Sequence, residues 1–526
     1  MEQRYDAVVI GSGIGGLAAA AALAKVGGKR VLVLERHFKA GGFTHTFHRK
    51  AYSWDVGLHY VGEMEPTSEA RQVMDFVTGG QVQWKKMPDR FDHCSYPGFE
   101  FEVPSDPVQY EAELSRAFPK EAKAIKAYFL DISRTRAWCE RYFAARMMPR
   151  PLAWLMTRPG ASAALATTGD YLKARFADER LRAVVASQWG AYGLPPGKSA
   201  FALHALIVHH YFHGGWYPEG GSAELAKGAQ RVIEAAGGTV QVNHEVTRIL
   251  VEGRRATGVE VRRGIGGRQT VVTFSADVVL STAGAALTYG ALLPPLGLEE
   301  QRPRPREEGR SVVVAYLGLK QSPATLGFLG ENRRIFRDWN HDELAASNTA
   351  EVLEGRPRYG TLSLQSMKDP RAKAYAAQIL TSIEPEAFAA WRGSVWRHRP
   401  AEYQALKQKV LDGLLGLVEA RYPGFRALVD YAELATPLSV ETFTGHPRGA
   451  IYGAAGTPAR FGDWRHRVRT PLKGLFLAGA DAAAVGIVGA MMGGVMAAGA
   501  TLGGRGFFHI MDAARAVSPS TGGPRR

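Results

Sequence analysis

Cysteine is scarce in this chain, with only Cys94 and Cys139 among 526 residues. Their spacing matches neither a CxxC pair nor a metal-binding cluster, which argues against a disulfide framework and a cysteine-built metal site. A chain of this length can bury a large apolar core without either. Sparse cysteine is typical of reducing compartments. The first strand is expected by residue 7, which leaves no room for a signal peptide, so we expect a cytoplasmic protein.

A convincing membrane-spanning run is also missing. The stretch from Ala482 to Gly504 carries no charged residue and is long enough to span a bilayer. It is built largely of Gly and Ala, with one Leu and one Ile, so its insertion into lipid would be weak. Because it follows a strand-like run, a cofactor-binding domain explains it better.

Acidic residues are in the minority, since 50 Asp and Glu stand against 65 Lys and Arg, for a formal net charge of +15. Such an excess first suggests nucleic acid as a partner. The basic residues are spread along the chain, however, and no nucleic-acid-binding module is recognisable, so we expect no nucleic-acid partner. An anionic membrane surface fits the distribution better.

The clearest motif that is present lies near the N-terminus. An apolar strand is predicted over residues 8–10, and an Ala- and Leu-rich helix over 17–26. Between them lie Gly11, Gly13 and Gly16. In a dinucleotide-binding turn the first glycine allows the tight turn, the second lets the backbone approach a pyrophosphate, and the third lets the helix pack on the strand. The helix N-terminus then offers unpaired N–H groups to the phosphates.

A second predicted strand, over residues 30–35, supports this interpretation. It ends in Glu35, where the fold places a carboxylate on a ribose hydroxyl, although an ordinary strand-end charge is the alternative. Arg36 follows directly and is assigned to the same site. Gly41 and Gly42 come too soon after it for a second helix, and their N–H groups can reach a diphosphate. This arrangement favours FAD over NAD.

A matching motif lies near the C-terminal end. Residues 472–481 predict a strand that passes Gly479 and ends in Asp481, and a helix is predicted from near Gly486 through Gly489. Asp481 can bond to ribityl hydroxyls, while the positive end of the helix points at the pyrimidine edge of a flavin. The alternative is a buried Asp that caps the helix.

The segment from Trp138 to Arg158 mixes aromatic and Met residues with four Arg. Such a mixture suits a surface that dips into lipid headgroups, and the alternative is the core of a helical cap. A later predicted helix over residues 200–212 is rich in His, and its His204 and Tyr211 share a face. No metal-binding spacing accompanies them, so core histidines and a substrate- or flavin-facing role both remain open.

Four longer segments give the chain a family resemblance: residues 40–47, 55–62, 191–222 and 447–453. The sequence resembles the flavoprotein family of all-trans-retinol saturases, carotenoid isomerases and phytoene desaturases, with the retinol saturases closest. The resemblance implies a split FAD domain and a membrane-facing polyene-binding domain. It also implies that Val246 meets the adenine end of a noncovalent FAD held by the glycines, Glu35 and Asp481.

We therefore predict an α/β fold, with a Rossmann-type FAD-binding domain of the glutathione reductase kind and an inserted α+β substrate domain. The FAD-binding domain is predicted to comprise residues 1–75, 216–290 and 436–510. The substrate and membrane-facing domain is predicted over 76–215 and 291–435, followed by a flexible tail over 511–526. No residue pattern with evident chemistry stands out between residues 286 and 435.

The expected function is that of an FAD-dependent oxidoreductase acting on a carbon–carbon double bond of an apolar, retinoid- or carotenoid-like polyene. Saturation is the preferred reaction, desaturation and isomerisation are alternatives, and a non-catalytic polyene or lipid carrier is the rival class. Saturation needs a proton donor, for which His59 and Tyr60 are the leading candidates and Tyr211 the second choice. NAD(P)H is a possible external electron donor, although no second glycine motif for it is evident. We expect peripheral attachment to the inner face of the membrane.

Overall fold

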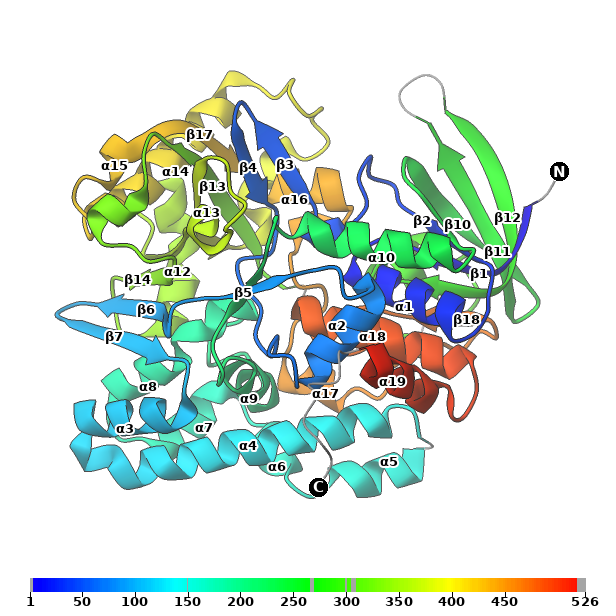
Figure 1. The fold of residues 1–526 in the computed structure, drawn as a ribbon, viewed down its shortest axis with the longest axis horizontal. Coiled ribbons are helices and arrows are strands. Elements are labelled where there is room, and N and C mark those ends of the chain that lie inside the picture. Colours follow the sequence, from blue (N-terminus) through cyan, green and yellow to red (C-terminus); the bar gives the residue numbers. More distant parts are fainter. Residues whose placement is uncertain (1–2, 149, 265–268, 299, 304–308, 518–526) are drawn as a thin grey trace.

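The computed structural model describes residues 3–148, 150–264, 269–298, 300–303 and 309–517. Within this part of the chain, the first large sheet has seven strands in the order β10-β11-β12-β1-β2-β9, with β18 beside β12. β1, β2, β9, β12 and β18 pair in parallel, whereas β10, β11 and β12 form an antiparallel meander. Figure 1 shows this sheet on the right. Its strands are β1 (Gln3–Ile10), β2 (Val31–Leu34), β9 (Thr239–Gln241), β10 (His244–Glu252), β11 (Arg255–Arg263), β12 (Thr270–Ser281) and β18 (Leu475–Leu477).

Both faces of the central strand β1 are buried, as expected for a parallel sheet. Val9 packs into the core under helices α1 (Ile14–Lys25) and α18 (Gly486–Thr501), while Val8 packs into a second core on the meander side. The Ala-rich sequence lets α1 bury every residue from Ile14 to Ala24. The helix begins three residues earlier than the sequence predicts, because Gly13 itself is the N-cap.

The second large sheet lies on the left in Figure 1. Its seven described strands follow the order β17-β13-β16-β15-β14-β6-β7, antiparallel except for the β14–β6 pair. Helices α12 (His341–Leu353) and α14 (Ala401–Glu419) pack against it around a separate apolar core. The strands are β6 (Arg90–Tyr96), β7 (Phe99–Pro104), β13 (Ser311–Leu319), β14 (Asn332–Phe336), β15 (Tyr359–Ser363), β16 (Tyr375–Ile383) and β17 (Val429–Ala435).

A helical layer lies below both sheets in Figure 1. The long helix α4 (Ala122–Ala145) runs along its edge and packs against α9 (Phe201–His210) and α5 (Arg150–Thr157). No helix among the described residues is long and apolar enough to cross a membrane. The remaining members of the layer are α3 (Pro107–Ala117), α6 (Ala161–Ala164), α7 (Thr168–Arg175) and α8 (Glu179–Ala186).

A short hairpin ties the first part of the chain to the second sheet. It consists of β3 (Thr46–Arg49) and β4 (Tyr52–Asp55). Trp54 is fully buried, and its indole N–H donates to the carbonyl of Leu317 on β13 at 3.0 Å. The hairpin therefore anchors the segment that carries His59 and Tyr60.

The C-terminal end corrects one prediction. The expected flexible tail begins at residue 511, but helix α19 (Gly506–Val517) extends through 511–517 and buries Ile510, Met511 and Ala514 against α18 and α2 (Glu69–Thr78). The apolar residues of this helix repeat at helical spacing, which the sequence interpretation overlooked. Residues 518–526 lie outside the described residues. The predicted division of the chain into two domains stays a prediction.

Candidate functional site

One large cavity of about 1310 Å³ is lined by residues of both sheets. Pockets for a single small ligand commonly measure roughly 300–1,000 Å³, so this cavity has room for a cofactor and a second molecule. The predicted cofactor residues lie along its wall, with the exception of Gly16. Those that line it are Gly11, Gly13, Glu35, Arg36, Gly41, Gly42, Val246, Gly479, Asp481 and Gly489.

The three glycines after β1 occupy different environments. Gly11 has φ +93, a conformation that favours glycine. Gly13 faces open space, since a Cβ there would meet no atom within 4 Å. Gly16 does not line the cavity, because it lies beneath the turn, where a Cβ would overlap the carbonyl oxygen of Gly11. The environments match the turn, approach and packing roles that the motif predicts.

Glu35 is held rigidly at the end of β2. Its carboxylate accepts hydrogen bonds from the Ser12 backbone N–H (2.9 Å), the Ser12 hydroxyl (2.7 Å) and the His37 N–H (2.8 Å). The hydroxyl of Ser12 in turn accepts from the N–H of Gly41 at 3.0 Å. Two carboxylate oxygens have about four acceptor sites, so capacity remains for a ribose hydroxyl.

The second glycine pair lies directly against the first. Gly41 forms an isolated bridge with Gly13, and a Cβ on Gly42 would lie 3.0 Å from the Gly13 Cα. Gly41 and Gly42 have φ +119 and +54, values that few other residues adopt. Together they form a wall of backbone without side chains, which fits a diphosphate.

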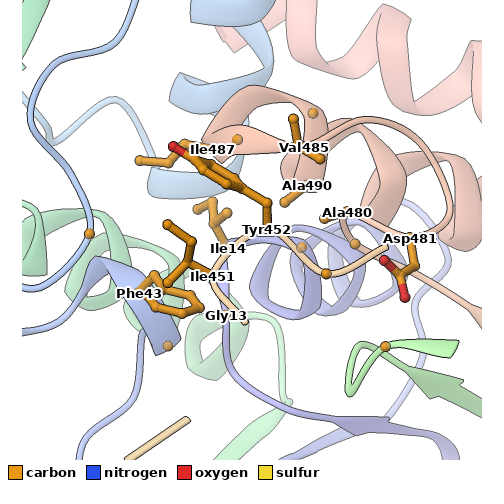
Figure 2. Close-up of a pocket in the computed structure, with 18 of the residues that line it drawn as sticks. Gly13, Ile14, Phe43, Ile451, Tyr452, Ala480, Asp481, Val485, Ile487 and Ala490 are labelled. Atoms are coloured by element: carbon orange, nitrogen blue, oxygen red, sulfur yellow. The ribbon is translucent and has the colours of Figure 1, made fainter. Parts of the chain in front are cut away.

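Asp481 anchors the opposite end of the cofactor cavity. Its two oxygens accept from the N–H groups of Ala285 (2.7 Å) and Ala454 (3.0 Å). Burial opposes ionisation, but the charge of Arg460 and these N–H groups hold the Asp481 pKa below its usual value. α18 begins at Gly486 beside it without a side-chain cap, so its first N–H groups are available to a bound flavin. Figure 2 shows Asp481 and Gly13 on this wall.

His59, the first candidate proton donor, lines the cavity but carries no proton to donate as an imidazolium near neutral pH. Burial, reinforced by the charges of Lys368 and Arg334, lowers its pKa to about 3. The imidazole is therefore neutral near pH 7. Its Nδ1 is buried without a hydrogen-bond partner among the described residues.

Tyr60 and Tyr211 stack in the cavity wall with ring centroids 4.4 Å apart. The Tyr60 hydroxyl donates to Asp92 at 3.0 Å and accepts from Arg334 at 2.7 Å. Burial raises the pKa of both phenols, so both stay protonated near neutrality, while Arg334 opposes that shift. Tyr60 is thus the better-connected proton donor of the two.

A buried polar network behind Tyr60 was missed by the sequence interpretation. Arg334 and Asp92 form an ion pair at 3.2 Å, with side chains 5% and 0% exposed. Lys368 donates to Asn332 (2.6 Å), to Ser363 (2.8 Å) and to the carbonyl of His59 (3.0 Å). Burial lowers the Lys368 pKa to about 7. The available signal was the run of polar residues at 331–334 leading into a strand.

The aromatic and Arg-rich segment divides into two parts. Trp138 and Tyr142 on α4 are core residues, with exposed fractions of 2% and 8%. On α5, by contrast, Leu152, Trp154 and Leu155 are 47%, 59% and 62% exposed. The core interpretation therefore holds for these two residues of α4, whereas α5 exposes apolar side chains and its contact with lipid stays a prediction. The His-rich helix α9 also divides, since His204 is buried between the hydroxyls of Tyr128 and Tyr192, whereas His210 lines the cavity.

Comparisons with known proteins agree with this geometry. The family model for flavin containing amine oxidoreductases matches residues 14–381. The all-trans-retinol 13,14-reductase of Danio rerio is 34% identical over 93% of this chain and 84% of its own length. The chloroplastic prolycopene isomerase of Arabidopsis thaliana is 24% identical over 94% of this chain and 82% of its own.

The solved structures show the same fold. Cyclohexylamine oxidase from Brevibacterium oxydans superposes with a TM-score of 0.58 at 17% identity, covering 98% of each chain. The glycine cradle, Glu35 and Asp481 fit FAD, as argued above. This chain belongs to the flavin-containing amine oxidoreductase family, among the relatives of the retinol 13,14-reductases, and is an FAD-dependent oxidoreductase.

Proposed function

We propose that this flavoenzyme acts on a carbon–carbon double bond of an apolar polyene and saturates that bond. The observation that carries the proposal is the apolar wall of the cavity next to the cofactor cradle. Phe43, Ile451, Tyr452, Val485 and Ile487 line it there (Figure 2). A long hydrocarbon would be desolvated by such a wall. Relatives named for retinol and prolycopene support the same substrate class.

The chain's own residues can supply positioning and a proton. Bound FAD, once reduced by an external electron donor, would supply the hydride. The residues assigned to hold it are the ten predicted cofactor residues that line the cavity and Ser12, which fixes Glu35. The enclosed apolar wall excludes water from the reacting carbons. The Tyr60 hydroxyl donates the proton, and Arg334 beside it stabilises the phenolate that remains. Tyr211 and neutral His59 are the alternatives.

The test is to express the protein in a host that makes polyenes and to extract them. A gain of two hydrogens marks saturation, a loss of two marks desaturation, and an unchanged mass with altered chromatographic retention marks isomerisation. A Tyr60→Phe variant with unchanged FAD content controls for the host's own enzymes. Unchanged polyenes, together with a bound flavin whose absorbance does not respond to added polyene, would instead favour the non-catalytic carrier.

We also propose that α5 attaches the protein peripherally to the cytoplasmic face of an anionic membrane. Its exposed Leu152, Trp154 and Leu155 lie next to Arg150, and the Arg158 guanidinium lies 4.9 Å from the ring centre of Trp154. Such an arrangement suits the headgroup zone. Phe143 and Met147, at the neighbouring end of α4, line the cavity, so an apolar substrate could enter from lipid near this helix.

A further inference from the structure

The second sheet contributes one charged side chain to the apolar cavity that has hydrogen-bonding capacity to spare. Arg334 on β14 lines the cavity and is 4% exposed. Its Nε donates to Asp92 at 3.2 Å and its Nη2 donates to Tyr60 at 2.7 Å. Among the described residues, Nη1 has no hydrogen-bond partner. Nη1 is not among the buried unpaired donors, so it is open to the cavity, where a ligand atom can reach it.

Open space lies in front of Nη1. The nearest glycine is Gly190, which also lines the cavity, and a Cβ placed on it would lie 3.9 Å from Nη1 with no other atom within 4 Å. Gly190 belongs to a short 3-10 helix over Ser187–Ala191, and its φ is not in the left-handed region. The gap can therefore admit a ligand atom without movement of the backbone.

The charges around this gap disfavour a cation. Arg334 is permanently charged and pairs with Asp92, whose carboxylate is already bound by Tyr60, Gln188, Asn332 and Arg334. Lys368, which donates to Asn332, adds positive charge when it is protonated, and Glu331 is paired with Arg333. A protonated amine, the substrate type suggested by the name of the wider family, would be repelled here. An oxygen acceptor would complete the hydrogen bonding.

We propose that Arg334 binds the terminal oxygen of an oxygenated polyene, a carboxylate or a hydroxyl, through Nη1 at Gly190. The rest of the ligand then extends along the apolar wall toward the cofactor cradle. This inference rests on the proposed function, because it requires a polyene in the cavity. If it is correct, the hydrogen bond from Arg334 makes the protein bind oxygenated polyenes more tightly than pure hydrocarbons.

The test measures binding to the FAD-loaded protein by fluorescence quenching, with three probes that share one chain. The probes are all-trans-retinoic acid, all-trans-retinol and the hydrocarbon that ends in a methyl group instead. Both oxygenated probes should bind roughly ten- to a hundredfold more tightly than the hydrocarbon. A comparison of the affinities for the acid and the alcohol shows whether the site prefers a carboxylate or a hydroxyl.

Arg334→Gln should abolish the preference for the oxygenated probes. This variant leaves Asp92 buried and without its ion-pair partner, which destabilises the fold. Gly190→Val keeps the ion pair and fills the gap before Nη1, so it should reduce the preference to about one. The neighbouring Ala191→Val adds bulk to the same cavity and should retain the preference. Equal binding of all three probes to the unaltered protein overturns this inference alone, as does an unchanged preference in Gly190→Val. Failure of every probe to bind overturns the proposed function as well.

Discussion

The glycines at positions 13 and 16 look alike in the motif but face different surroundings. Ala at Gly13 would point into open cavity, whereas Ala at Gly16 would overlap the Gly11 carbonyl oxygen. We therefore expect Gly13→Ala to keep the melting temperature of the apoprotein and to bind FAD at least tenfold more weakly, because the methyl occupies phosphate space.

Gly16→Ala is the matched variant and should lose both stability and FAD, since α1 cannot close on β1. Melting curves and FAD titrations of the two apoproteins make the comparison. Equal destabilisation by both substitutions would contradict these assignments.

Lys368 makes stability depend on pH in a defined direction. Its pKa is lowered from 10.5 to about 7 by burial, so above pH 7 the folded protein releases a proton that the unfolded chain still holds. Stability contributed by this residue therefore rises between pH 7 and 10.5. Between about pH 7 and about pH 9.5 the free energy of unfolding should increase by about 3 kcal/mol more in the unaltered protein than in Lys368→Met.

Denaturant unfolding of both proteins at the two pH values measures this difference. Other titrating groups cancel in the comparison, because both proteins contain them. Parallel pH dependence of the two proteins would show that Lys368 stays protonated in the folded protein over the whole range.

At the scale of single elements, the proposed attachment to an anionic membrane depends on helix α5. Each fully buried Trp or Leu side chain contributes about 1.5–3 kcal/mol and each nearby Arg about 1 kcal/mol to lipid binding. Trp154→Asp with Leu155→Asp should therefore abolish cosedimentation with anionic vesicles at low salt, while FAD content stays unchanged.

The matched control places two Asp on exposed apolar residues elsewhere. Val271 on β12 and Leu329, just before β14, are 64% and 71% exposed and belong to other segments of the chain than α5. Their replacement should leave vesicle binding intact. If the α5 variant still sediments with vesicles, another surface makes the contact.

Elements with local signals could be predicted from the sequence, and contacts between distant segments could not. The strand–glycine–helix order around Gly11, the short strand β18 that ends four residues before Asp481, and the helix beginning at Gly486 all depend on neighbouring residues. Asp92 and Arg334 meet only because β6 and β14 pair in parallel, although they lie 242 positions apart. No periodicity brings such residues together. For the same reason the exposed face of α5 could not be separated from the buried face of α4.

At the scale of the whole molecule, the cavity couples both sheets. Its lining runs from Ile10 to Phe507 and includes Arg334 of the second sheet. Because FAD binds only the folded form, free cofactor at a hundred times its Kd should stabilise the protein by about 2.7 kcal/mol. We expect one calorimetric transition that moves upward as a whole by about 5 °C or less. Two transitions, of which FAD shifts one, would show that the sheets unfold independently.

The order of strands in the first sheet also governs how the chain is made. β1 pairs in parallel with β12, and the partners Gln3 and Phe274 are 271 positions apart. At roughly 5–20 residues per second, the ribosome needs about 14 to 54 seconds after β1 to synthesise the chain as far as β12. Through that interval the apolar residues of β1 and α1 emerge without the strand and helix that later cover them. Ribosome-associated chaperones should therefore hold the nascent N-terminal segment, and its release should await the synthesis of β12.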